Sequence, residues 1–110
     1  METISFDIRK AKIIEDAVCE EFGCSIGEIL CFKNTFFKKV VVYLLVKVHG
    51  YNKRNIGLHY LITYLYVPTV VEELEWKYRN IVVFKKSISN VCKKLRYESD
   101  LDLGGKHNFN

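Results

Sequence analysis

The sequence predicts an all-α protein, a compact domain of five or six helices. Three observations lead to this fold class. Proline and glycine are scarce, with one and six residues respectively, which disfavours a turn-rich β-sandwich. Apolar residues recur at helical spacing in several segments, and residues typical of helix caps lie at the ends of those segments. Hydrophobic residues make up 49% of the 110-residue chain, enough for one core and too many for a largely disordered protein.

The first 35 residues predict two helices after an extended lead-in over residues 1–7. Residues 8–22 form an amphipathic segment that Gly23 ends. Ser25 and Glu28 have the spacing of a capping box, which predicts a short helix to about Leu30 and a loop over residues 31–35. The apolar stripe of the first helix consists of Ala11, Ile14, Val18 and Phe22.

The stretch from Lys38 to Tyr60 organises the rest of the chain, and its first half is ambiguous. Residues 40–48 include five β-branched valines, and such a run can form a buried strand as easily as a buried helix. Gly50 is a usual residue just after a helix, and Asn52 can cap a second one. We therefore predict a helix that Thr35 caps, a short turn, and a second helix from residue 53, the scaffold of a helix-turn-helix.

Two further helices are expected after residue 60. Pro68 suits the first turn of the next helix, and a last helix is predicted over residues 82–96. We expect a single domain over residues 1–97 and a flexible tail over 98–110. Tyr64 and Tyr66 would be exposed if their segment is a loop and packed if it continues the preceding helix, and we expect at least one of them in the core. Trp76 is expected in the core or in a dimer contact.

Charge is unevenly distributed along the chain. Residues 31–60 contain six lysines or arginines and no carboxylate, within a chain of net charge +4. Such a block is either an ordinary solvated face or a phosphate-binding surface. The four cysteines show neither a CxxC pair nor zinc-ligand spacing, which predicts reduced thiols in a cytoplasmic protein without a metal or other cofactor. No apolar stretch is long and uninterrupted enough to predict a membrane span.

Nothing in the sequence indicates an enzyme. His49 and His59 are ten residues apart without a neighbouring carboxylate in sequence, and neither a nucleophile elbow nor a phosphate-binding loop is present. Binding therefore remains the expected activity.

Residues 18–30 (VCEEFGCSIGEIL) and 40–60 (VVVYLLVKVHGYNKRNIGLHY) resemble the C-terminal DNA-binding domain of bacterial DnaA replication initiators. The closest matches are Tyr43-Leu44 and Ile56-Gly57, with Thr69-Val70 near the family's Thr-Val, and the resemblance covers roughly residues 10–97. It implies a Trp-repressor-like all-helical domain whose helix-turn-helix enters the major groove of duplex DNA. Residues 61–70 replace the family's Gly-Gly-Arg-Asp-His-Thr-Thr-Val signature, so we expect weak or altered sequence preference.

On this interpretation the DNA-binding residues are expected at three helix starts. Lysines before and within the first turn of the long helix would contact phosphates, the next helix start would clamp the opposite backbone, and a threonine on the third would reach a base edge or thymine methyl. These residues are Lys33, Lys38 and Lys39, then Lys53 and Arg54, and finally Thr69.

The alternative hypothesis is a protein-binding module of the same fold that does not bind DNA. Its partner, a different protein or a second copy in a homodimer, would contact Tyr64, Tyr66 and Trp76. DNA binding requires Lys38, Lys39, Lys53 and Arg54 on one exposed face, whereas protein binding requires an exposed apolar patch between residues 64 and 76.

Overall fold

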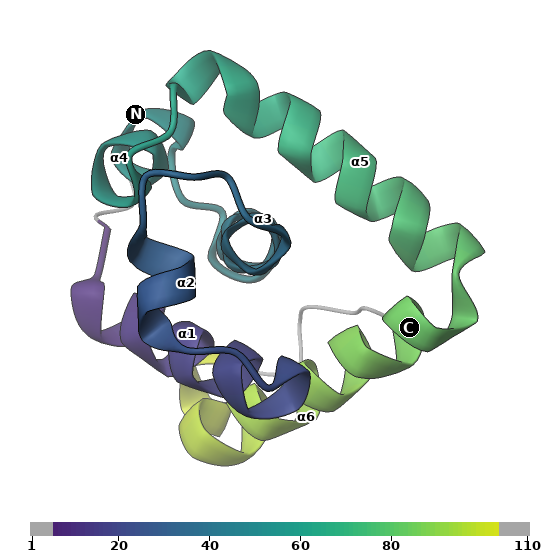
Figure 1. Ribbon diagram of the computed structural model, residues 1–110. Coiled ribbons are helices and arrows are strands. Elements are labelled where there is room, and N and C mark those ends of the chain that lie inside the picture. Colours follow the sequence, from purple (N-terminus) through teal and green to yellow (C-terminus); the bar gives the residue numbers. More distant parts are fainter. Residues whose placement is uncertain (1–5, 104–110) are drawn as a thin grey trace.

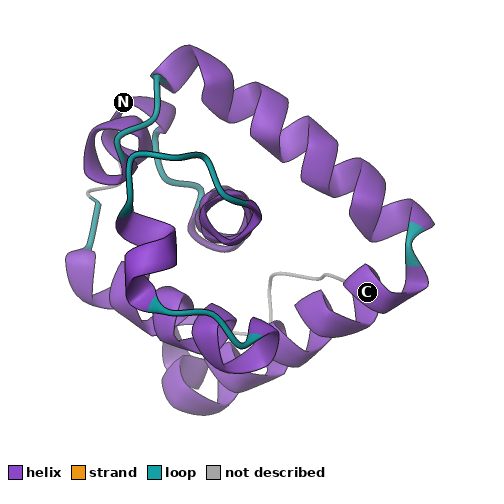
Figure 2. Cartoon of the chain, viewed as in Figure 1, coloured by secondary structure: helices purple, strands orange, loops and turns teal. Residues whose placement is uncertain are grey.

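The computed structural model describes residues 6–103, with side chains described to residue 95, and this part of the chain contains helices and no strand (Figures 1 and 2). The predicted all-α class is confirmed. The six α-helices of the described chain are α1 (Ile8–Phe22), α2 (Ile26–Leu30), α3 (Phe36–Leu44), α4 (Lys53–Tyr60), α5 (Val67–Asn80) and α6 (Val82–Leu103). A π-helical turn, η1 (Leu45–His49), extends α3, and a 3₁₀ turn, η2 (Tyr64–Tyr66), precedes α5.

Helix α3 lies at the centre of the molecule. Figure 1 shows it end-on, with α1 and α6 on one side, α5 along another, and α2 and α4 on the third. All six residues from Val40 to Leu45 are fully buried. Thr35 begins the helix, because its side chain accepts a hydrogen bond from the backbone N–H of Lys38 at 3.2 Å. Burial on every face accounts for a run of valines that forms a helix despite its β-propensity.

The helix ends around this centre follow the predicted cap chemistry. Gly23, with φ of +69°, ends α1, and the Ser25–Glu28 capping box begins α2. Gly50, with φ of +67°, ends the π-helical turn, and the Asn52 side chain accepts from the backbone N–H of Arg54 at 2.7 Å. These positive φ angles favour glycine, because other residues meet steric strain there.

The connection between α4 and α5 is neither an open loop nor a continued helix. Leu61 adopts a left-handed conformation with φ of +58°, and the backbone N–H of Ile62 donates to the Gly57 carbonyl at 3.0 Å. The chain then forms η2 and enters α5 with Pro68 in its first turn, as predicted. We call the surface formed by residues 53–69 the α4–α5 corner.

Helix α6 begins at Val82 as predicted and runs to Leu103, beyond the expected end at residue 96. The remainder of the expected tail, residues 104–110, lies outside the described residues, as do residues 1–5 of the expected lead-in.

Candidate functional site

Two cations and a tyrosine form a cluster at the α4–α5 corner. Lys53 and Arg54 are exposed in the first turn of α4, and neither forms an ion pair with a described residue. The Arg54 guanidinium carbon lies 4.4 Å from the centroid of the Tyr64 ring, and the Lys53 ammonium nitrogen lies 5.8 Å from the same centroid. Both distances are within the range of cation–π attraction. The ring therefore holds two positive charges together at the surface.

A groove of about 330 Å³ adjoins this cluster. Its lining residues are Arg54, Gly57, Leu58, Ile62, Thr63 and Tyr64. Three exposed leucines are also found at the α4–α5 corner: Leu58 is 79% exposed, Leu61 52% and Leu65 67%. The corner thus presents both positive charge and apolar surface.

Lys38 lies in the interior, which corrects the expectation that it belongs to an exposed face. Its side chain is fully buried, and its ammonium group donates hydrogen bonds to the carbonyl oxygens of Cys31 and, at 2.6 Å, Tyr60. Burial lowers the pKa of Lys38 below its ordinary value. The ammonium is enclosed by main chain, so a phosphate cannot reach it in this structure.

Lys39 faces α5 and is already paired. Its ammonium donates to Glu73 at 3.2 Å, and only 19% of the side chain is exposed. Burial lowers the pKa of Lys39, but the hydrogen bond and charge of Glu73 outweigh it and raise the pKa overall. The predicted exposed face of four cations is therefore reduced to Lys53 and Arg54.

The acidic side chains of α5 are partly turned toward α3. Glu75 accepts a hydrogen bond from the Tyr43 hydroxyl at 2.9 Å and forms ion pairs with Lys47 at 3.3 Å and Arg79 at 3.4 Å. Together with the Lys39–Glu73 pair, these contacts neutralise two of the three carboxylates on the helix. Glu72 is the exposed one.

The other two expected DNA-binding residues are exposed. Thr69 lies in the first turn of α5, within the α4–α5 corner. Lys33 lies in the loop after α2, beside Phe32, which is 84% exposed. Because Lys38 bonds both Cys31 and Tyr60, this loop lies against the C-terminal end of α4.

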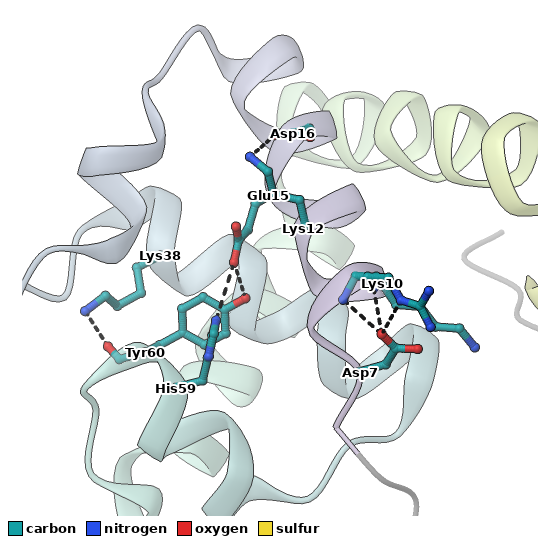
Figure 3. A network of polar contacts seen from close by, with 9 residues as sticks. Asp7, Lys10, Lys12, Glu15, Asp16, Lys38, His59 and Tyr60 are labelled. Carbon is teal, nitrogen blue, oxygen red and sulfur yellow. Dashed lines mark hydrogen bonds and ion pairs between the residues drawn. The ribbon is translucent and has the colours of Figure 1, made fainter.

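A buried polar network surrounds Tyr60, and the sequence analysis did not predict it (Figure 3). The Tyr60 hydroxyl donates to Glu15 at 2.6 Å, and the His59 ring nitrogen lies 4.0 Å from the same carboxylate. Burial, together with the Glu15 carboxylate, raises the pKa of Tyr60 above its ordinary value. Since Lys38 bonds the Tyr60 carbonyl, one residue of α4 joins a buried cation of α3 to a buried anion of α1.

The aromatic residues of the alternative hypothesis are only partly exposed. Tyr64 and Tyr66 are half-buried, and Tyr66 packs against the core without belonging to it, so the expectation that at least one of them lies in the core is wrong. Trp76 is 58% exposed on α5, so it is not in the core, and the expected dimer contact stays a prediction.

Comparison of the chain with protein-family models, curated proteins and solved structures gives no significant match. Among the described side chains, which end at residue 95, no three His, Cys, Asp or Glu residues are grouped as metal ligands. The same part of the chain lacks a helix with the length and apolarity needed to cross a membrane.

Proposed function

We propose that the protein binds duplex DNA through a helix-turn-helix formed by α4 and α5, mainly by contacts with the phosphate backbone. This motif lies one helix later than the pair predicted from residue 35 to residue 60, because residues 40–45 of that pair's first helix are fully buried. The observation that carries this proposal is the pair of exposed cations, Lys53 and Arg54, held on Tyr64 without a described carboxylate partner. Cations in such a position are available to phosphates, whereas lysines in internal ion pairs are not.

The geometry of the corner supports the helix-turn-helix interpretation. A Cβ atom on Gly57 would lie 2.5 Å from the Ile62 carbonyl oxygen, so only glycine permits this close approach of helix and turn. Glu73 and Glu75 contact α3 side chains, which removes two carboxylates from the surface that would face DNA. The resemblance of residues 18–30 and 40–60 to the DnaA C-terminal domain points in the same direction.

Sequence preference is expected to be weak or altered. Thr69, in the first turn of α5, is placed for a base edge or a thymine methyl, and Thr63 lines the adjoining groove. The bidentate arginine contacts that usually identify guanine have no equivalent in residues 61–70.

Fluorescence anisotropy of labelled duplexes, one random and one carrying an initiator box, tests the proposal. With Lys33, Lys53 and Arg54 as three phosphate contacts, the log–log salt slope should be about −2.7, a loss of about 40-fold in affinity between 50 and 200 mM salt. Replacing Lys53 and Arg54 by alanine should reduce the magnitude of that slope by about 1.8, to about 0.9. The matched control is Lys86→Ala, an exposed lysine on α6, which should leave affinity and slope unchanged. Absence of binding at 50 mM salt, or equal losses in the control and the double variant, would refute the proposal.

A protein-binding function is the second candidate, and the exposed leucines Leu58, Leu61 and Leu65 favour it. An apolar patch of this kind often marks a contact with another protein. The two functions predict opposite sensitivities in any binding assay. DNA binding depends on the cations and on salt, whereas partner binding depends on the leucines and tolerates Lys53→Ala and Arg54→Ala.

A further inference from the structure

The loop after α2 carries an exposed lysine but has little packing of its own. Phe32, Lys33 and Asn34 are all exposed. Thr35 fixes the end of the loop, because its hydroxyl donates to the Glu28 carbonyl at 2.7 Å. That bond joins the loop to α2, so it does not determine where Lys33 lies relative to α4.

The connection to α4 is made by the Lys38 ammonium. It donates to the carbonyl of Cys31, the C-cap of α2, and to the carbonyl of Tyr60, the last residue of α4. Carbonyls at a helix C-terminus lack intrahelical partners and lie at the negative end of the helix dipole. One buried cation therefore caps two helices at once and holds their ends side by side.

Tyr60 is itself fixed on its other side. Figure 3 shows Lys38 at the carbonyl of Tyr60 and Glu15 at its hydroxyl. The end of α4 is thus a fixed point, and the loop is attached to that point through Lys38. Cys31, two residues before Lys33, is thereby held at the end of the helix whose first turn carries Lys53 and Arg54.

We propose that Lys38 is a positioning residue for DNA binding. Its buried ammonium contacts no phosphate but sets Lys33 beside α4, so that Lys33 contacts the same duplex as Lys53 and Arg54. This inference rests on the proposed function. It gives an interior lysine a measurable role in an interface from which its own charge is excluded.

The salt slope distinguishes positioning from a general structural role. Lys38→Met keeps most of the side-chain volume but removes the donor. It should reduce the magnitude of the salt slope from about 2.7 to about 1.8, which is the equivalent of one phosphate contact. Lys33→Ala should have the same effect, and the double variant should lose no more than either single variant. Lys38→Arg, which keeps a cationic donor, should restore most of the slope. Val91→Ala, a core change on α6, controls for stability loss and should leave the slope unchanged.

Hydrogen exchange of the free protein supplies a readout that does not need DNA. The Leu61 and Ile62 amides both donate to the Gly57 carbonyl at the end of α4, and they should exchange faster in Lys38→Met than in the wild type or Lys38→Arg, under conditions where α1 and α5 remain protected. Unchanged exchange at these two amides, or an unchanged slope in Lys38→Met with DNA binding intact, would overturn the inference. Failure of every variant and the wild type to bind DNA would refute the proposed function, and the exchange result would still decide whether Lys38 holds the end of α4.

Discussion

Gly57→Ala is the sharpest test of the α4–α5 corner. An added Cβ atom would lie 2.5 Å from the Ile62 carbonyl oxygen, 3.3 Å from the Tyr64 backbone nitrogen and 3.4 Å from the Tyr64 Cα. Ordinary contact begins near 3.4 Å, so the Ile62 carbonyl would have to move by roughly 0.9 Å. The obstructing atoms belong to the main chain, which cannot rotate away as a side chain can. The turn that presents Tyr64 and Thr63 must therefore deform.

The expected cost follows from two opposing terms. Overpacking of this kind costs about 1–3 kcal/mol, while exchanging glycine for alanine inside a helix returns up to about 1 kcal/mol. We expect a net loss of about 1–2 kcal/mol, which corresponds to a fall in Tm of about 5–15 °C for a domain of this size. Thermal and urea denaturation measure it, and anisotropy at a temperature where the variant remains folded should show a further loss of DNA binding.

Gly27→Ala is the matched control. Gly27 is also helical, but the nearest atom to an added Cβ is the Ser25 hydroxyl oxygen at 3.8 Å, an ordinary contact. This variant should be neutral or gain up to about 1 kcal/mol. If Gly57→Ala were as stable as Gly27→Ala, the close approach in the corner would not exist and the reasoning would fail.

Two pH predictions follow from the buried hydroxyls and carboxylates. Burial, with hydrogen bonds to Glu75 and Glu15, raises the pKa values of Tyr43 and Tyr60 above 10, so their stabilisation is complete below pH 10 and is lost above it. Above pH 10 each tyrosine makes the free energy of unfolding fall by about 1.4 kcal/mol per pH unit. Urea denaturation measured between pH 9 and 11.5 should therefore show a pH dependence that is shallower by that amount above pH 10 in Tyr60→Phe than in the wild type. The titration of Lys38 occurs in both proteins and cancels in this comparison. On the acid side, burial raises the pKa of Glu75, but hydrogen bonds from Tyr43 and Lys47 outweigh it and hold the pKa below 4.5. That contribution is present above pH 4.5 and disappears as pH falls, so Glu75→Gln should make the free energy of unfolding depend less on acid pH, by up to about 1 kcal/mol. The matched control is Glu72→Gln, at the exposed carboxylate of the same helix.

Helix positions were predictable because their causes are local. Ser25, Thr35 and Asn52 each bond a backbone N–H two or three residues away, so the sequence alone contains both partners. Gly23 and Gly50 likewise occupy left-handed positions that their neighbours require. The helical conformation of the valines in α3 was harder to predict, because local propensity favoured a strand and only burial on all sides explains the helix.

The interior charges were not predictable from such local rules. Lys38 bonds Tyr60, 22 residues away, and Tyr60 bonds Glu15, 45 residues away. Helical spacing does not distinguish Lys38 from Lys39, because Lys38 precedes Val41 and Val42, and Lys39 precedes Val42 and Tyr43, by three and four residues, and all three of these are fully buried. The charge of Lys38 suggested a surface position, and only its distant carbonyl partners explain why it is interior.

The burial and pairing of these lysines reduce the number of phosphate contacts that the basic block of residues 31–60 can make. Counted from sequence, its six cations would give a salt slope of about −5.4 if all contacted phosphates. Lys38 is interior, and Lys39 and Lys47 pair with Glu73 and Glu75, which leaves Lys33, Lys53 and Arg54 and a slope of about −2.7. A measured slope of about −4.5 would therefore carry structural information of its own. It would mean that DNA competes successfully with the α5 carboxylates for their lysines, and that the Lys39–Glu73 and Lys47–Glu75 ion pairs open when the complex forms.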